Sequence, residues 1–241
     1  MKTAGLILRL TALIFIISLK LFKEGIFMKT SKIINNEKLF PYIAYEPENL
    51  SEHPALIIQL HGAGERGNGG DQLDRVLVHG FSNVVNDEVL KDCILVMPQC
   101  PEDTFWVAKI ESIKKFIDDM VSTYSADTDR IYLCGLSMGG FGTWYTAMAY
   151  PDLFAAIAPC CGGGMAWNAD VLKMPVWAFH GKDDTVVSPR HTIEMIEKLE
   201  GKNPNLKYNL YEGVGHNSWE KAFSVELLEW LLSHRKQVKK A

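Results

Sequence analysis

The feature that most constrains this chain lies between residues 130 and 145, where an apolar run turns abruptly into a helical pattern. The run ends in Gly135-Leu-Ser137-Met-Gly139, and the residues after it favour a helix. A serine on so sharp a strand-to-helix turn takes strained backbone geometry. Glycines two positions to either side remove the Cβ atoms that would otherwise collide with strand and helix. The pattern predicts a Ser137 hydroxyl held above the end of a sheet.

An alkyl hydroxyl is a poor nucleophile near neutral pH, so a catalytic serine needs a base, and the base needs a group that fixes its tautomer. The chain supplies both after Ser137. One predicted strand is followed by the acidic pair Asp183-Asp184, and the next is followed by His216. The carboxyl ends of neighbouring parallel strands open on one crevice, so we expect these side chains to converge. An incidental serine in a glycine-rich turn would leave this order of partners unexplained.

Alternating strands and helices run through the rest of the chain without a linker or a repeat, which predicts an α/β fold with a mostly parallel sheet. Strands are expected at 39–45, 55–60, 93–97, 130–134, 155–159, 176–179 and 206–211. Helices are expected at 105–124, after Ser188-Pro189 and at 218–235, and 71–85 is expected to be at least partly helical.

Four separated motifs make the chain similar to the α/β-hydrolase superfamily. They are His61-Gly-Ala-Gly-Glu-Arg-Gly67, Gly135 to Gly139, His180-Gly-Lys-Asp-Asp184 and Gly215-His216. The resemblance covers roughly residues 38 to 235 and points to the compact group of carboxylesterases, phospholipases and feruloyl esterases, related to the prolyl oligopeptidase catalytic domain. It implies one domain with a doubly wound, mostly parallel sheet flanked by helices, without a large cap domain, and no cofactor or metal.

Carried over position by position, the resemblance implies Ser137 as nucleophile, Asp184 as triad acid and His216 as base. Family members usually carry the acid four residues after the histidine of the His-Gly strand end, which is His180 in this chain. The alternatives left open are Asp183 for the acid, and His191 and His234 for the base, although both histidines are expected in helical runs at the surface.

The negative charge that develops during acyl transfer needs hydrogen-bond donors, and backbone N–H groups can supply them without ordering a side chain. The candidates are the N–H of Ala63, in the loop after the strand at 55–60, and the N–H of Met138. The same loop spells G-x-G-x-x-G from Gly62 to Gly67, the pattern of a dinucleotide site. Such a site needs an acid ending a second strand about 20 residues on. Only Asp87-Glu88 is near, in a polar stretch, so no nucleotide is expected.

Composition agrees with one catalytic domain. The chain has 241 residues, of which 47% are hydrophobic and 22% charged, and this is enough to bury a substantial core. The formal net charge is −4 and the one basic run is the short tail from Arg235 to Lys240, so we expect no nucleic-acid partner. Five cysteines without a C-x-x-C or metal-type spacing favour buried thiols and a reducing, cytoplasmic compartment.

Residues 1–27 are expected to lie outside the catalytic domain, which takes residues 28–241. Leu10 to Leu19 is an uncharged apolar run of ten residues, too short to span a bilayer and without a small-residue cleavage site after it. Three interpretations stay open: an interfacial anchor, an inefficient export signal, or translated upstream sequence with the start at Met28, which we favour. Membrane contact or export is expected only if residues 1–27 are retained.

A short connection predicts an open cleft. Only the 14 residues 162–175 lie where related hydrolases often carry a helical lid. An open cleft favours soluble, modest or polymer-borne esters over long acyl chains. The side chains expected to line it are Gln99, Trp106, Trp167 and Trp219, each of which could instead serve packing.

These observations predict a serine carboxylic-ester hydrolase that works through an acyl-enzyme on short-chain or aromatic-acid esters, either small molecules or polymer-borne. A serine peptidase similar to prolyl oligopeptidase stays an alternative, although no propeller or gating domain precedes residue 38. A lactonase of the dienelactone type would normally carry cysteine in place of Ser137. A non-catalytic binding module is the alternative from another class, and the intact triad disfavours it.

Overall fold

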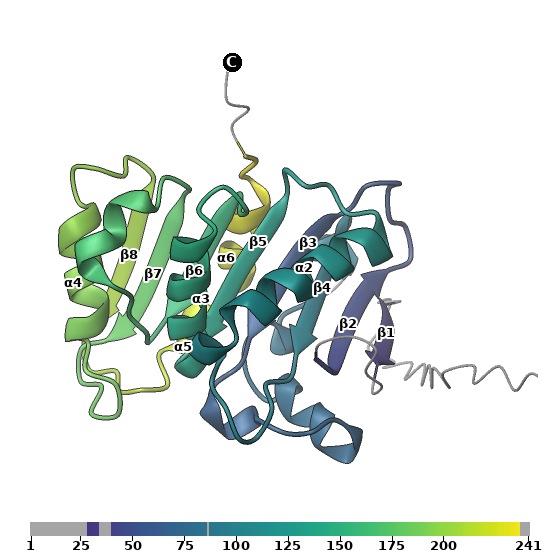
Figure 1. Cartoon of the computed structure of the whole chain (residues 1–241), viewed down its shortest axis with the longest axis horizontal. Coiled ribbons are helices and arrows are strands. Elements are labelled where there is room, and N and C mark those ends of the chain that lie inside the picture. Colours follow the sequence, from purple (N-terminus) through teal and green to yellow (C-terminus); the bar gives the residue numbers. More distant parts are fainter. Residues whose placement is uncertain (1–27, 34–39, 86, 237–241) are drawn as a thin grey trace, which may run out of the picture.

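Eight strands form one mixed sheet in the part of the chain that the structure, a computed structural model, describes: residues 28–33, 40–85 and 87–236 (Figure 1). The extension expected at residues 1–27 lies outside the described residues. The strands are β1 Met28–Ile33, β2 Tyr42–Pro47, β3 Ala55–Leu60, β4 Cys93–Pro98, β5 Ile131–Leu136, β6 Ala156–Cys160, β7 Val176–Gly181 and β8 Leu206–Tyr211. Seven strands were expected, and each is present within a few residues of its predicted place.

The sheet order is β1-β2-β4-β3-β5-β6-β7-β8, with antiparallel pairing only at the β1–β2–β4 edge. From β3 the chain moves to β4 on one side and then to β5 on the other side of β3. Loops that leave the sheet at such a switch point diverge and open a crevice at the carboxyl ends of the strands. The loop that starts at His61 and the turn at Ser137 both lie at this point.

Helices cover both faces of the sheet. Figure 1 shows α2, α3 and α4 in front of the sheet and α6 behind it. The front layer holds α2 Ile110–Tyr124, α3 Met138–Ala149 and α4 Arg190–Leu199, with the short 3₁₀ helices η4 Trp106–Ala108 and η5 Ala166–Val171. The back layer holds η2 Gly70–Leu77, η3 Phe81–Asn83, α1 Asp87–Leu90, α5 Trp219–Ala222 and α6 Val225–Leu232. Each layer closes its own hydrophobic core against the sheet.

The segment at 71–85 is partly helical, as expected, and holds the 3₁₀ helices η2 and η3. Another expected helix differs from the structure for a local reason. The helix expected at 218–235 breaks between α5 and α6, where Ser224 is extended and its side chain accepts a hydrogen bond from the Leu227 N–H. Ser224 therefore caps a new helix. Among the described residues, no helix has the length and apolar character needed to cross a membrane.

The turn after β5 packs backbone against backbone. A Cβ added at Gly135 would lie 2.3 Å from the Gly139 carbonyl oxygen, and one added at Gly139 would lie 2.0 Å from the Leu60 carbonyl oxygen at the end of β3. Neither neighbour is a flexible side chain that could move aside. Glycine at 135 therefore lets the end of β5 contact the start of α3, and glycine at 139 lets the start of α3 contact the end of β3.

We expect Gly139→Ala to lower the free energy of unfolding by about 1–3 kcal/mol, the usual cost of overpacking. Gly64→Ala is the matched control, because a Cβ there meets nothing within 4 Å. Urea unfolding followed by circular dichroism measures both variants. Equal stability of the two would show that the turn yields around the added methyl group.

Candidate active site

Ser137 stands between β5 and α3 in a strained conformation. Its φ and ψ are 53° and −117°, a left-handed φ that L-residues seldom adopt. The turn is held by the Ser137 N–H, which donates to the Cys160 carbonyl at 2.9 Å, and by the Phe141 N–H, which donates to the Ser137 carbonyl at 3.1 Å. Backbone strain of this kind persists where the surrounding structure fixes it. It points the Ser137 side chain out of the strand and the helix.

The structure brings Ser137, His216 and Asp184 together although they follow three different strands. Ser137 Oγ lies 2.9 Å from His216 Nε2, and His216 Nδ1 lies 2.7 Å from Asp184 Oδ2. A carboxylate only accepts, so the Nδ1 that faces it carries the hydrogen. In neutral His216 the Nε2 atom is therefore free to take the Ser137 proton. This is the geometry of a nucleophile, a base and an orienting acid.

Asp184 is buried and fully hydrogen-bonded. Its Oδ1 accepts from the backbone N–H groups of Val186 and Val187, each at 2.9 Å. Burial acts to raise the pKa of Asp184, but the hydrogen bond from His216 and the two backbone donors outweigh it and hold the pKa below its ordinary value. Asp184 is thus a fixed negative charge behind the base.

The alternative acid and bases lie elsewhere. Asp183 is exposed, and its backbone N–H bonds the Val214 carbonyl. His191 is exposed on α4, where its ring meets that of Phe141 at 5.5 Å. His234 follows α6 and is half-buried, not at the surface as expected, with its ring 4.7 Å from that of Trp230. The geometry favours Asp184 and His216.

The loop after β3 lies directly beside the serine. A Cβ added at Gly62 would come 3.6 Å from Ser137 Cβ, and one added at Gly139 would come 2.8 Å from the His61 carbonyl oxygen. Ala63 begins the 3₁₀ helix η1 (Ala63–Glu65), and Met138 begins α3. First-turn N–H groups have no partner inside their own helix. Both predicted oxyanion donors therefore sit at helix starts that flank the nucleophile.

His61, for which the sequence suggested no role, holds this loop. The Cys100 N–H donates to His61 Nε2 at 2.9 Å, so in the neutral ring Nδ1 carries the hydrogen and donates to the Gly62 carbonyl at 2.6 Å. Burial lowers the pKa of His61 to about 4, which keeps the ring neutral at pH 7. The ring therefore holds the Gly62–Ala63 peptide group, which carries the Ala63 N–H.

Two of the side chains expected to line the cleft lie in the interior instead. Trp106 is fully buried and its Nε1–H donates to the His61 carbonyl at 3.0 Å. Gln99 is fully buried, and its amide donates to the Glu65 and Gln72 carbonyls at 3.0 and 2.7 Å. Both follow β4 at the expected end of the sheet, but their side-chain N–H groups donate to backbone carbonyls in the interior. Their role here is to hold the backbone.

The other two expected side chains differ from each other. Trp219, at the start of α5, is half-buried, and its ring packs edge-on against His216 at 5.1 Å and 86°. It therefore lies at the site. Trp167 on η5 is 79% exposed and makes no hydrogen bond or ring contact recorded among the described residues, so its part in substrate binding stays a prediction.

Charged side chains of the His61 motif also border the site. Arg66 Nε donates to the Ala63 carbonyl at 2.9 Å, and the guanidinium lies over the Phe105 ring at 5.0 Å. Glu65 Oε2 is buried and has no hydrogen-bond partner among the described residues. A Cβ added at Gly62 would lie 2.9 Å from this oxygen. The sequence motif from His61 to Gly67 contains Glu65 and Arg66, and it was the signal that could have assigned both to the loop after β3.

Cys161, Asp184 and His216 form a three-residue group whose potential metal-ligand atoms lie within 4.8 Å of one another. Each is already engaged: the Cys161 thiol lies 3.2 Å from the His216 carbonyl and 2.7 Å from Ser218 Oγ. The two other donors belong to the triad. The group therefore consists of two triad residues and a cysteine that contacts the His216 backbone.

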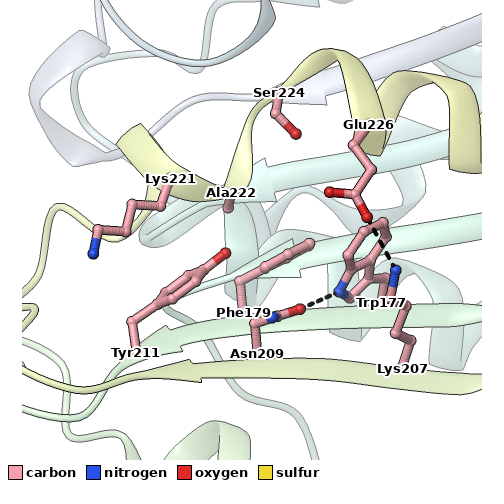
Figure 2. A pocket seen from close by; sticks show the side chains of 9 residues that line it. All are labelled: Trp177, Phe179, Lys207, Asn209, Tyr211, Lys221, Ala222, Ser224 and Glu226. Carbon is pink, nitrogen blue, oxygen red and sulfur yellow. Dashed lines mark hydrogen bonds and ion pairs between the residues drawn. The ribbon is translucent and has the colours of Figure 1, made fainter.

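A cavity of about 210 Å³ lies under α5 and the start of α6, on the back face of β7 and β8 (Figure 2). Two pairs of its polar groups are in contact: Trp177 Nε1 donates to Asn209 Oδ1 at 2.7 Å, and Lys207 Nζ meets Glu226 Oε1 at 3.4 Å. No triad residue lines it. The cavity is therefore separate from the candidate active site.

We expect Ser137→Ala and His216→Ala each to remove nearly all ester turnover, because nucleophile and base act as one unit. Asp184→Asn should lower kcat by about 10⁴ by misorienting the imidazole. Asp183→Asn is the matched control and should stay near wild type, since its side chain is exposed. Hydrolysis of p-nitrophenyl acetate and labelling by a fluorophosphonate measure all four. A crippled Asp183→Asn beside an active Asp184→Asn would reverse the assignment of the acid.

Ala63→Pro should lower kcat by about 10²–10³ by deleting one oxyanion donor. The first position of a helix tolerates proline, and the extended ψ of −177° at Gly62 suits a residue before proline. Ala63→Ser keeps the N–H and is the control. Steady-state kinetics are read beside circular dichroism. Wild-type kcat in a folded Ala63→Pro protein would remove this N–H from the site.

The chain is similar to several esterases. It is 30% identical over 159 residues to a bifunctional acetylxylan esterase/xylanase of Neocallimastix patriciarum, covering 60% of this chain and 21% of that protein. It is 26% identical over 148 residues to feruloyl esterase B of Neurospora crassa, covering 54% and 48%. This chain therefore spans less than half the length of either relative.

A solved structure is consistent with this similarity to esterases. A thermostable esterase matches with a TM-score of 0.71 and 29% identity, covering 86% of this chain and 63% of that one. The model of the dienelactone hydrolase family matches residues 40–226, a range that contains all three triad residues. The chain belongs to the dienelactone hydrolase family, with the α/β-hydrolase fold and a serine at the turn after β5.

Proposed function

We propose that this protein hydrolyses carboxylic esters through an acyl-enzyme, and the observation that carries the proposal is the unbroken chain of contacts from Ser137 Oγ through His216 to buried Asp184. Ser137 Oγ attacks the ester carbonyl while His216 Nε2 takes the hydroxyl proton. His216 then passes that proton to the leaving alcohol. A water molecule then attacks the acyl-enzyme while the same Nε2 atom takes its proton. Nε2 passes this proton to the leaving Ser137 Oγ, which frees the acid and restores the enzyme.

The backbone around the serine supports this reaction electrostatically. Each tetrahedral intermediate carries a negative oxygen, which the N–H groups of Ala63 and Met138 receive. These donors are fixed by the His61 ring and by the contact of Gly139 with Leu60. Preorganised donors need no rearrangement as the charge develops, so they lower the barrier.

The substrates we propose are acetyl and aromatic-acid esters, including esters carried on a polymer. The names of the two relatives, an acetylxylan esterase and a feruloyl esterase, support this class. The short connection between β6 and β7 supports it too, because residues 161–175 hold the single 3₁₀ helix η5. A cleft without an enclosing lid admits a polymer strand and gives a long acyl chain little apolar surface.

We also propose a reducing, cytoplasmic location. All five cysteines are buried and free in the structure, as small hydrophobic side chains would be. Any contact with a membrane is proposed only for a chain that keeps residues 1–27.

The acyl group is tested with a p-nitrophenyl ester series. We expect kcat/KM to peak at acetyl to butyryl, because an enclosed site would gain about fourfold per methylene, from ~0.8 kcal/mol per buried CH₂, and an open one should not. Acetylated xylan and methyl ferulate test the two proposed classes, and a peptide p-nitroanilide tests the peptidase alternative. A chain that starts at Met28 should give the same profile.

Two outcomes would contradict this proposal. A rate that climbs steadily to decanoate would show that an apolar surface covers the site. Inactivity on every ester, with Ser137 unlabelled by fluorophosphonate, would favour a binding module.

A further inference from the structure

A second histidine stands behind the triad acid. His180, at the end of β7, is fully buried, and its Nε2 lies 3.1 Å from Asp184 Oδ2, the same oxygen that His216 Nδ1 contacts. Its Nε2 also lies 3.0 Å from the Val187 carbonyl. The mechanism above makes no use of His180.

The hydrogen-bond partners of His180 determine which ring nitrogen carries a hydrogen. A carboxylate and a carbonyl both face Nε2, and neither can donate, so Nε2 carries a hydrogen. Burial is the largest influence on the ring and lowers the pKa of His180, despite the opposing contacts with Val187 and Asp184. The neutral ring therefore presents an Nε2–H to Asp184 and an unprotonated Nδ1 on its other side.

Thr192 of α4 fixes that other side. Its Oγ1 lies 2.7 Å from His180 Nδ1 and 2.6 Å from the Gly162 carbonyl. In the neutral ring Nδ1 can only accept, as the Gly162 carbonyl does, so these two acceptors share the single hydroxyl hydrogen of Thr192. The contacts Thr192–His180–Asp184–His216 thus form one buried chain from α4 to the catalytic base.

We propose that His180 is a positioning residue that acts through Asp184: its Nε2–H gives the carboxylate a second imidazole donor, which fixes Oδ2 and weakens the stabilisation that Asp184 gives to protonated His216. The inference rests on the proposed triad but not on the identity of the ester. A carboxylate oxygen that already accepts one N–H bond attracts a second donor less strongly than a free one. Loss of the His180 donor should therefore strengthen the attraction of Asp184 for the proton on His216, and the acid limb of the rate profile reports this change.

Other titratable groups face this chain of contacts and need a control. The Cys160 and Cys161 thiols at the end of β6 lie beside Asp184 and Ser218. Asp183 is exposed and turned away. Measuring each His180 variant also in a Cys161→Ser background separates thiol titration from titration of the base.

Three substitutions of His180 test the proposal. His180→Gln places an amide N–H near the position of Nε2 and keeps the donor to Asp184. His180→Asn places its amide near Nδ1 instead, so it keeps a partner for Thr192 but not for Asp184. His180→Leu keeps neither. Thermal unfolding of each shows whether it is folded, and the rate of p-nitrophenyl acetate hydrolysis is measured from pH 5 to pH 9.

We expect His180→Leu and His180→Asn to lower kcat about tenfold and to move the acid limb of kcat/KM upward by roughly half a pH unit or more, because Asp184 loses a hydrogen bond to its charged form. His180→Gln should restore the wild-type limb. Thr192→Val, which removes only the hydroxyl, should shift the limb in the same direction by less, and Thr192→Ser should not shift it.

Unchanged acid limbs in folded His180→Leu and His180→Asn would overturn the proposal and leave His180 a packing residue. A limb that moves equally in His180→Gln would overturn it too, because the donor would then not matter. If wild type hydrolyses no ester, the same limbs are read from the rate of fluorophosphonate labelling of Ser137. Failure of the proposed ester class is thereby kept separate from failure of this inference.

Discussion

The contact of the Gly139 backbone with the Leu60 carbonyl is the constraint on which the site depends. It joins the start of α3 to the end of β3, so the nucleophile and the loop with the oxyanion donors come from opposite sides of the switch point yet touch. Any side chain at Gly139 would separate them. The strained φ of Ser137 is tolerated because this close backbone packing fixes the conformation of the turn.

Buried polar groups then fix what the backbone brings together. Asp184 accepts four hydrogen bonds, two from backbone N–H groups and two from imidazoles. A carboxylate with fewer donors would be costly to bury and free to rotate. The four donors instead keep Asp184 ionised and fix its orientation. The orientation of His216 follows from it, and so does the direction of the Nε2 lone pair toward Ser137.

The sheet and the triad could be predicted because they depend on local signals: apolar runs give strands, and glycine with a polar residue marks their ends. β1 was not expected, since Met28–Ile33 is a largely polar edge strand without an apolar face pattern. Trp106 and Gln99 were placed at the correct strand end but on the wrong side of the loop. The groups that turn them inward, the His61 and Gln72 carbonyls, lie 45 and 27 residues away in sequence.

Two of the three His-Gly pairs of the chain, those at strand ends, have parallel roles that only the structure shows. His61-Gly62 follows β3 and His180-Gly181 ends β7, and in each pair a buried histidine joins its strand end to a neighbouring loop. Gly181 lets the Val214 and Gly215 carbonyls approach, as Gly62 lets the Glu65 carboxylate approach. In the proposed mechanism His61 positions an oxyanion donor and His180 positions the triad acid, so loss of His61 should lower kcat without moving the acid limb. The pH profile therefore distinguishes two histidines that burial and sequence context make look alike.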